Sequence, residues 1–241
     1  MCTLSWQLNG TSLEILFNRD EKLSRPAALP PDTLTLNGVR VLAPLDPKGG
    51  GTWLATNEHG LTLCLLNNYL HQPPTAPANA RSRGQLVREL ASVSNPGIVG
   101  RRLSEIAPEQ YQPFFLIAFE ERSFPRQWHW DGHSIRETGM PGCPVSTSSL
   151  YPRLVPRLRR YYYRLATRNG FRTLTPAQLL DFHSSRRPWP PAFSVAMARR
   201  DRGTVSLTRV RIGPSETIMD YWHGDPAIDP LRASPCALQR H

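Results

Sequence analysis

Residues 1–21, MCTLSWQLNGTSLEILFNRDE, decide the expected fold because they have the pattern of two strands joined by a tight turn. Apolar and polar residues alternate through 3–8 and again through 13–17, which is typical of half-buried strands. Asn9-Gly10 lies between the two runs and is a strong signal for a two-residue hairpin turn. The stretch therefore predicts an antiparallel hairpin with one apolar face.

The register of this hairpin decides what lies beside Cys2. A turn at Asn9-Gly10 places Cys2 opposite Phe17 and diagonal to Arg19, whereas a register shifted by two residues places Arg19 directly opposite Cys2. In both registers Arg19 shares a face with Cys2. The sequence leaves both registers open.

Cys2 follows the initiator methionine, and a small second residue favours removal of Met1. Cys2 would then carry a thiol together with an α-amine of pKa about 7.7–8.0, a nucleophile with its own base. Arg19 would favour the thiolate, and Asp20 or Glu21 would hold the α-ammonium or orient Arg19. The plain alternative is a small buried side chain followed by a solvated turn.

Composition limits the class of protein. A chain of 241 residues forms one large domain or two small ones. It has no apolar run long enough to cross a bilayer and no N-terminal secretory pattern. Its scattered cysteines predict a reducing cytoplasm. The net charge of +10, almost all from arginine, permits a small-molecule or lipid ligand that is anionic.

The rest of the chain alternates blocks of strands and helices. We expect strands at 39–42, 53–56, 61–66, 114–119, 127–130, 193–198, 205–212 and 216–221, and helices at 83–91, 97–106, 151–168 and after Thr175-Pro176. Ser82 and Gln85 form a predicted capping box. Gly49–Gly51 predict a close-packed turn, since no Lys-Ser/Thr pair follows them. This order predicts an α+β domain of antiparallel sheets covered by helices.

An ordered set of short motifs resembles the NRDE family, also called the Transport and Golgi organization protein 2 family. The set comprises MCT at the N-terminus, NRDE at 18–21, RP at 25–26, GGTW at 50–53, NYL at 68–70, Arg81, RG at 83–84, LV at 86–87 and FFLIAFE at 114–120. The resemblance implies an N-terminal nucleophile hydrolase-like αββα sandwich of two antiparallel sheets between helix pairs. We expect this single domain to span residues 1–225, with a loosely ordered tail at 226–241.

The resemblance extends in layout to cysteine amidases that cleave bile-salt and penicillin amides. It implies that the catalytic residues are Cys2, Arg19, Asp20 and Asn68. Asn18, Glu21, Trp53, Asn67 and Thr147 are the expected substrate-binding residues. Two positions depart from the pattern: Thr147 stands where an asparagine is expected, and Val205 where an arginine is expected.

The sequence thus supports two functions. The first is hydrolysis of a non-peptide C–N amide in a small molecule or lipid by Cys2, with no cofactor required. The alternative is a non-catalytic protein on the same scaffold that binds and carries haem, an acyl lipid or acyl-coenzyme A. Neither function names a substrate, an oligomeric state or a pathway.

Two further patterns have alternative interpretations. His129, Asp131 and His133 would share one face of a strand and permit a metal site, but spacing positions no fourth ligand and we expect none. An arginine series on the predicted helix 151–168 could bind phosphate, anionic lipid or nucleic acid. We favour a solvated basic face, because no nucleic-acid motif accompanies the series.

Overall fold

A computed structural model describes residues 1–9, 11–71, 80–121, 123–168, 172–229 and 233–240. The chain forms two compact units, which are described separately. The first unit comprises Met1–Arg25, Gly142–Arg211 and Asp220–Pro235, and the second comprises Pro26–Pro141, Ile212–Met219 and Cys236–His241. The helices of the described residues are all too short or too polar to cross a membrane.

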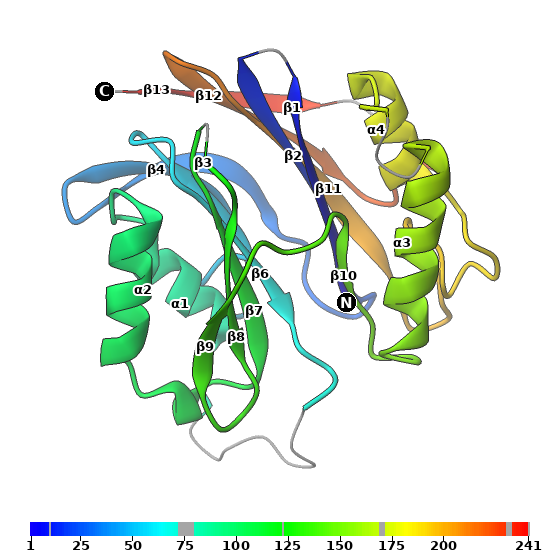
Figure 1. Cartoon of the computed structure of the whole chain (residues 1–241), viewed down its shortest axis with the longest axis horizontal. Helices are drawn as coiled ribbons and strands as arrows, with labels where there is room; N and C mark the ends of the chain where they lie inside the picture. Colours follow the sequence, from blue (N-terminus) through cyan, green and yellow to red (C-terminus); the bar gives the residue numbers. More distant parts are fainter. Residues whose placement is uncertain (10, 72–79, 122, 169–171, 230–232, 241) are drawn as a thin grey trace. The chain divides into compact units, whose positions relative to one another are not determined.

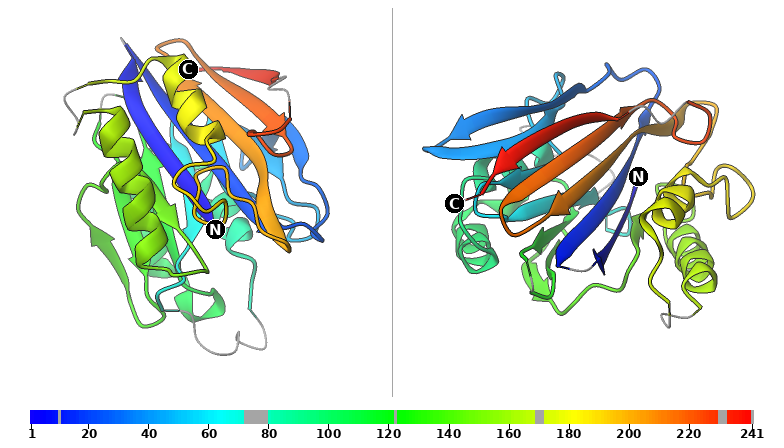
Figure 2. Two further views of the ribbon diagram at one scale, coloured as in Figure 1. Left: turned by 90° about the vertical axis from the view of Figure 1, so that its right-hand side faces the viewer. Right: turned by 90° about the horizontal axis from the view of Figure 1, so that it is seen from above.

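The first unit holds most of a six-stranded sheet with the strand order β10-β1-β2-β11-β12-β13, of which residues 212, 216–219 and 236–239 are assigned to the second unit. The strands are β1 (Cys2–Asn9), β2 (Ser12–Lys22), β10 (Val145–Thr147), β11 (Arg202–Ile212), β12 (Glu216–His223) and β13 (Ser234–Gln239). Helices α3 (Leu154–Ala166) and α4 (Pro176–Ser184) pack on one face of this sheet, over the β1–β2 hairpin (Figure 2, left). Tyr163, Leu179 and Phe182 from these helices join Leu16 and Leu207 in one apolar core.

The second unit holds a seven-stranded sheet with the order β3-β4-β5-β6-β7-β8-β9 (Figure 1). The strands are β3 (Leu29–Leu36), β4 (Val39–Leu45), β5 (Leu54–Asn57), β6 (Thr62–Asn67), β7 (Phe114–Phe119), β8 (Arg126–Trp130) and β9 (Ile135–Thr138). Helices α1 (Arg83–Leu90) and α2 (Pro96–Glu105) cover one face and bury Leu86, Val99 and Leu103 against it. A short 3₁₀ helix, Pro108–Gln110, follows them. The predicted α+β class, with antiparallel sheets and helix pairs, is confirmed.

The β1–β2 hairpin adopts the second of the two expected registers, the one shifted by two residues. Cys2 lies opposite Arg19, and Asn9 pairs with Ser12. The turn therefore does not consist of Asn9 and Gly10, and Gly10 itself lies outside the described residues. The alternation of side chains was predicted correctly, while the position of the turn was not.

The expectation of a half-buried hairpin is wrong, because its polar face is buried as well. Thr3 and Ser5 are fully buried on the side that helices cover. Ser5 Oγ lies 2.7 Å from His183 Nε2 of α4, and the Gln7 side-chain amide donates to the carbonyl of Leu174 at 2.9 Å. The polar residues of β1 are therefore hydrogen-bonded to groups of the helical layer, which removes the penalty for burying them.

Two glycines explain the close-packed turn before β5. A Cβ atom on Gly51 would lie 2.1 Å from the backbone carbon of Gly84, and the Thr52 amide donates to the Gly84 carbonyl at 3.0 Å. Only a residue without a side chain allows this approach. The GGTW and RG motifs thus meet at one backbone contact, as expected of a structural turn.

Three other segments differ from the sequence prediction. Residues 193–198 are not a strand: Val195 and Ala196 donate to the carbonyls of Arg187 and Ser185 in a folded loop. The amides of Phe193 and Ser194 donate to the carbonyls of Pro190 and Pro191, so this segment folds back on the Pro-rich loop before it and does not extend as a strand. Residues 25–31 have the Pro-rich pattern of a connection, but they lead into edge strand β3, where such prolines are tolerated. The tail expected to be loose contains β13.

The predicted capping of helices is borne out in part. Ser82 caps α1 by accepting from the Gly84 amide, but the Gln85 side chain donates to the Gly49 carbonyl and does not close a capping box. A full capping box occurs at α4, between Thr175 and Gln178.

Candidate functional site

The candidate site of the first unit is a row of three residues on neighbouring strands. Cys2 at the start of β1 lies opposite Arg19 of β2 and opposite Thr147 of β10. Directly opposed residues of an antiparallel pair share one face. Cys2 is 8% exposed, and both of its neighbours are also buried. Among the described residues the Thr147 hydroxyl has no hydrogen-bond partner.

Burial dominates the electrostatics of the nucleophile candidate. It raises the pKa of the Cys2 thiol, while the amino group of the chain and, to a smaller extent, Arg19 lower it. With Met1 in place the net effect favours the thiol over the thiolate. Arg19 therefore acts in the expected direction, but it does not outweigh the loss of hydration.

Met1 is part of the packed structure and is 2% exposed. Its ammonium donates to the backbone carbonyl of Asp20 at 3.3 Å, and the Asp20 amide donates to the Met1 carbonyl at 3.1 Å. Ser148 Oγ lies 3.2 Å from the Met1 sulfur. The backbone of Asp20 thus holds the amino group of Met1. The carboxylate expected beside the α-ammonium of Cys2 concerns the chain after Met1 has been removed and stays a prediction.

Glu21 lies between two arginines. Its carboxylate is 4.0 Å from the Arg19 guanidinium and 3.7 Å from that of Arg25. The expected role of Glu21 in orienting Arg19 beside Cys2 stays a prediction.

Asp20 points to the opposite face of β2 and belongs to a buried network. Its Oδ1 accepts from Thr204 Oγ1 at 2.6 Å, and its Oδ2 lies 3.6 Å from Nη1 of Arg159. Burial raises the pKa of the Asp20 carboxyl, while Arg159 and Thr204 act against that shift. This network lies directly beneath the strand ends that carry Cys2 and Arg19.

Arg159 is the residue of this network that the sequence did not reveal. It is fully buried, and it donates to Thr3 Oγ1 at 2.8 Å and to the Phe193 carbonyl at 3.0 Å. Burial lowers the pKa of its guanidinium, and Asp20 opposes that effect. The arginine expected at Val205 is absent from the sequence, but α3 provides a guanidinium beside Asp20.

The contacts of Asn18 indicate a structural role. Its side-chain amide donates to the carbonyls of His183 and Val195 at 2.8 and 3.1 Å, and its Oδ1 pairs with His183 Nδ1 at 2.8 Å. Burial, assisted by Arg159, lowers the pKa of His183 to about 3. Asn18 therefore ties β2 to α4 and to the loop after it.

The remaining predicted site residues lie in the second unit. Trp53 is buried, and the Asn67 amide donates to the Tyr69 hydroxyl at 3.1 Å. Asn68 is fully buried; its amide donates to His129 Nε2 at 2.6 Å and to the Trp130 carbonyl at 3.4 Å, while its Oδ1 accepts from the Leu70 amide. Both N–H groups of Asn68 are therefore engaged within this unit.

The histidine-rich segment forms a turn, which explains the absence of a metal-binding face. Strand β8 ends at Trp130, and Asp131 Oδ1 accepts from the amides of His133 and Ser134. These bonds lower the pKa of Asp131 to about 2. No group of three or more His, Cys, Asp or Glu side chains in the described part of the chain could hold a metal ion.

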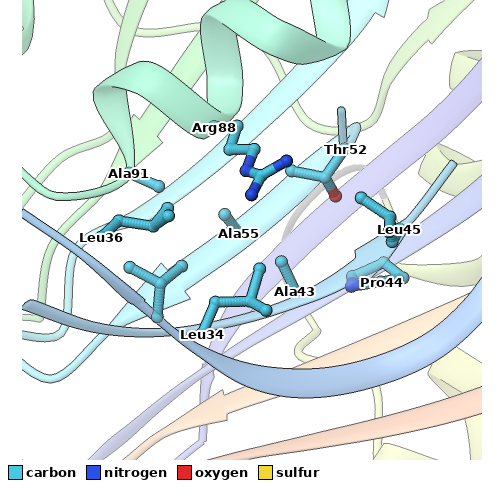
Figure 3. Close-up of a pocket in the computed structure, with 10 residues that line it drawn as sticks. Leu34, Leu36, Ala43, Pro44, Leu45, Thr52, Ala55, Arg88 and Ala91 are labelled. Carbon is cyan, nitrogen blue, oxygen red and sulfur yellow. The ribbon is translucent and has the colours of Figure 1, made fainter. Parts of the chain in front are cut away.

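A small apolar pocket of the second unit lies between β3, β4 and α1 (Figure 3). It is lined mainly by Leu34, Leu36, Val41 and Ala43, with Arg88 at one side. Its cavity volume of about 10 Å³ corresponds to the space of one water molecule. The pocket as it stands is too small for a substrate.

Known structures define the fold class. The chain superimposes on penicillin V acylase from Agrobacterium tumefaciens with a TM-score of 0.58 and 11% identity, covering 99% of this chain and 86% of that one. It superimposes on a cysteine-to-alanine mutant of conjugated bile acid hydrolase from Clostridium perfringens with a TM-score of 0.64 and 10% identity, covering 98% of this chain and 92% of that one. The third similar structure is a Caenorhabditis elegans N-acylethanolamine-hydrolyzing acid amidase ortholog, with a TM-score of 0.54 and 8% identity, covering 96% of this chain and 95% of that one. The chain thus has the fold of the N-terminal nucleophile hydrolases.

The family is shown by a separate comparison. Residues 1–141 match the model of the family described as Transport and Golgi organisation 2, so the chain belongs to this family. No curated protein matches the chain.

Proposed function

We propose that this protein is a cysteine N-terminal nucleophile amidohydrolase that acts on a non-peptide C–N amide of a small molecule or lipid. The observation that carries the proposal is the row formed by Cys2, Arg19 and Thr147 at the start of the first strand. The fold neighbours add support, since their names include an acylase, a bile acid hydrolase and an amidase. These similarities suggest the class of reaction and name no substrate for this chain.

The reaction begins once Met1 has been removed. The new α-amine of Cys2 takes the proton of the thiol, and the thiolate attacks the amide carbonyl carbon. The ammonium then returns a proton to the leaving nitrogen as the C–N bond breaks, which leaves a thioester on Cys2. Water, deprotonated by the same amine, cleaves the thioester and releases the carboxylic acid. No cofactor enters these steps.

The oxyanion needs hydrogen-bond donors, each worth roughly 3–4 kcal/mol in serine hydrolases. The free hydroxyl of Thr147, opposite Cys2, is the first candidate in this proposal. Asn68 is the candidate that the family resemblance implies. Its longer bond, 3.4 Å to the Trp130 carbonyl, would have to open before that N–H could serve a substrate.

Arg19 and Arg159 have different roles in this proposal. Arg19 shares the face of Cys2 and would stabilise the thiolate and bind a negatively charged part of the substrate. Arg159 lies on the other face and holds Thr3 and Asp20 in place. Arg159 is therefore a positioning residue.

A second candidate is non-catalytic binding of an acyl lipid or acyl-coenzyme A on the same scaffold. It is favoured by the raised pKa of Cys2 and by the engagement of both Asn68 N–H groups. Haem has less support, because two candidate axial ligands among the described residues, the partly buried Cys143 and the buried His183, already have protein partners. Cys143 Sγ lies 3.5 Å from the Trp6 amide, and both ring nitrogens of His183 are hydrogen-bonded.

The decisive test has two steps. The intact mass of protein from its native host shows whether Met1 is removed, and protein without Met1 is then assayed on a panel of N-acyl amides. We expect hydrolysis that is abolished in Cys2→Ala and retained in the matched control Cys236→Ala. Retention of Met1 on all molecules, or equal turnover by Cys2→Ala, would exclude the mechanism. Bound lipid that survives Cys2→Ala would then establish the carrier function.

A further inference from the structure

Helix α3 is oriented opposite to what its apolar pattern suggests. Its buried residues are Val155, Arg159 and Tyr163. Leu154, Tyr161 and Leu165 recur at helical spacing and are 45%, 62% and 58% exposed. An amphipathic helix normally buries its leucines and exposes its arginines. Here the exposed side contains an apolar stripe that the first unit does not cover.

A row of arginines runs beside this stripe. It comprises Arg153, Arg157, Arg160, Arg164 and Arg168, all exposed and spaced by three or four residues. Residues at such spacing share one side of a helix. No acidic residue occurs between 151 and 168, so the positive charge of this side is not neutralised from within the helix.

The loop after α4 adds aromatic residues beside the start of α3. Phe193 packs edge-on against Tyr151 with ring centroids 5.8 Å apart, and its carbonyl accepts from Arg159. The Phe193 amide donates to Pro190 in the same loop. Trp189 precedes this proline and is 76% exposed. Tyr151, three residues before Leu154, is also exposed, so its aromatic ring extends the apolar stripe.

We propose that the outer face of α3, defined as the apolar stripe with the arginine row, binds the surface of a membrane that contains anionic phospholipids. Arginines would pair with lipid phosphates while Leu and Tyr side chains enter the headgroup region, as in helices that lie in a membrane interface. Trp189 and Tyr151 have the amphipathic rings that favour this interface. This surface is independent of the Cys2 chemistry proposed above.

The apolar stripe distinguishes a membrane from nucleic acid as the partner. A phosphate backbone would pair with the arginines, but it would leave the exposed leucines in water. A lipid surface satisfies both kinds of side chain. Binding should therefore weaken at high salt without vanishing, because burial of the stripe is not screened.

The experiment is vesicle flotation of the full chain with phosphatidylcholine vesicles that contain 0 or 30 mol% phosphatidylglycerol. We expect binding to the anionic vesicles to be much tighter than to the neutral ones, and to fall at least about tenfold in Arg157→Glu/Arg164→Glu. The matched control Arg101→Glu/Arg200→Glu changes the net charge equally at exposed positions outside α3 and should stay within about threefold of wild type. Circular dichroism confirms that each variant is folded.

A second pair of variants tests the apolar stripe. Leu154→Gln/Leu165→Gln should bind normally at low salt and lose the binding that remains at high salt. The proposal is overturned if wild type ignores anionic vesicles, if the control pair weakens binding as much as the α3 pair, or if the leucine pair binds like wild type at all salt concentrations. Tight binding of a DNA or RNA duplex without vesicle binding would assign the surface to nucleic acid.

Discussion

The two faces of the β1–β2 hairpin use polar residues in opposite ways. On the face of Cys2, the thiol and the Thr147 hydroxyl are buried, and the hydroxyl has no partner among the described residues. On the other face, Asn18 is hydrogen-bonded to His183 of α4 and Asp20 to Thr204, and the second oxygen of Asp20 lies 3.6 Å from Arg159 in a buried ion pair. A buried polar group lowers the stability of the fold unless it has a hydrogen-bond or ionic partner. The comparison suggests that one face maintains the fold while the other is kept available for chemistry.

The largest expected loss of stability follows from removing the guanidinium of Arg159, on the face of the hairpin opposite Cys2. Arg159→Met leaves Asp20 buried without its ionic partner, and removal of one member of a buried pair costs about 3–5 kcal/mol. Urea unfolding at pH 7 measures the loss of free energy. The exposed neighbour provides the control, since Arg160→Met should change the free energy of unfolding by less than about 0.5 kcal/mol. Equal values for the two variants would show that the buried network does not stabilise the fold.

A second effect concerns pH. The pKa of His183 is lowered to about 3 in the folded chain, whereas an unfolded histidine has a pKa near 6.5. The unfolded state therefore binds a proton first as the pH falls, and stability decreases by roughly 1.4 kcal/mol per pH unit below about 6.5. Between pH 7 and 4.5 this amounts to about 3 kcal/mol.

Unfolding of His183→Gln at both pH values checks this assignment. The variant should lack the contribution of His183 to the pH dependence, while the exposed control His59→Gln should retain it. If His183→Gln and wild type lose the same free energy on acidification, the burial of a neutral His183 is not the cause.

The smallest effect on stability is expected on the face of Cys2. Cys2→Ala removes one small buried group and should cost no more than about 1 kcal/mol. The reactivity of the Cys2 thiol itself is the more sensitive test of this face. In protein that retains Met1, Cys2 should react with iodoacetamide more slowly than Cys236, because burial raises its pKa. In protein without Met1, faster labelling of Cys2 than of Cys236 would support the view that the face of Cys2 is available for chemistry. Labelling of Cys2 that stays slow would contradict that view.

The sequence predicted the features that depend on local pattern. Alternation predicted the β1–β2 hairpin, the short apolar run 114–119 predicted strand β7, and the placement of Cys2 on the face of Arg19 followed from parity alone. The hairpin register was left open, because Asn9-Gly10 favours one turn while the pairing of Asn9 with Ser12 results from the whole sheet. A Pro-rich segment concealed β3, since prolines in edge strands have the same local pattern as those in loops.

The network beneath the site could not be predicted for a different reason. Helical periodicity shows which residues of α3 share a side, but it does not show which side faces the sheet. In the fold Leu154 and Leu165 are exposed and Arg159 is buried. The buried partner of Arg159 lies far away in sequence, at Asp20. A long-range ion pair of this kind leaves no signal in a single sequence.

The burial of Met1 also sets an order of events during synthesis. Its backbone exchanges hydrogen bonds with Asp20, and its side chain is enclosed beside Ser148. An aminopeptidase must draw the end of the chain into its own active site, and the folded hairpin offers no such free end. Excision of Met1, which the proposed mechanism requires, would therefore have to occur during synthesis, before residue 20 and the strands around it have paired. Chains refolded from denaturant with Met1 attached would stay unprocessed, so the history of a sample would decide whether Cys2 has an amine.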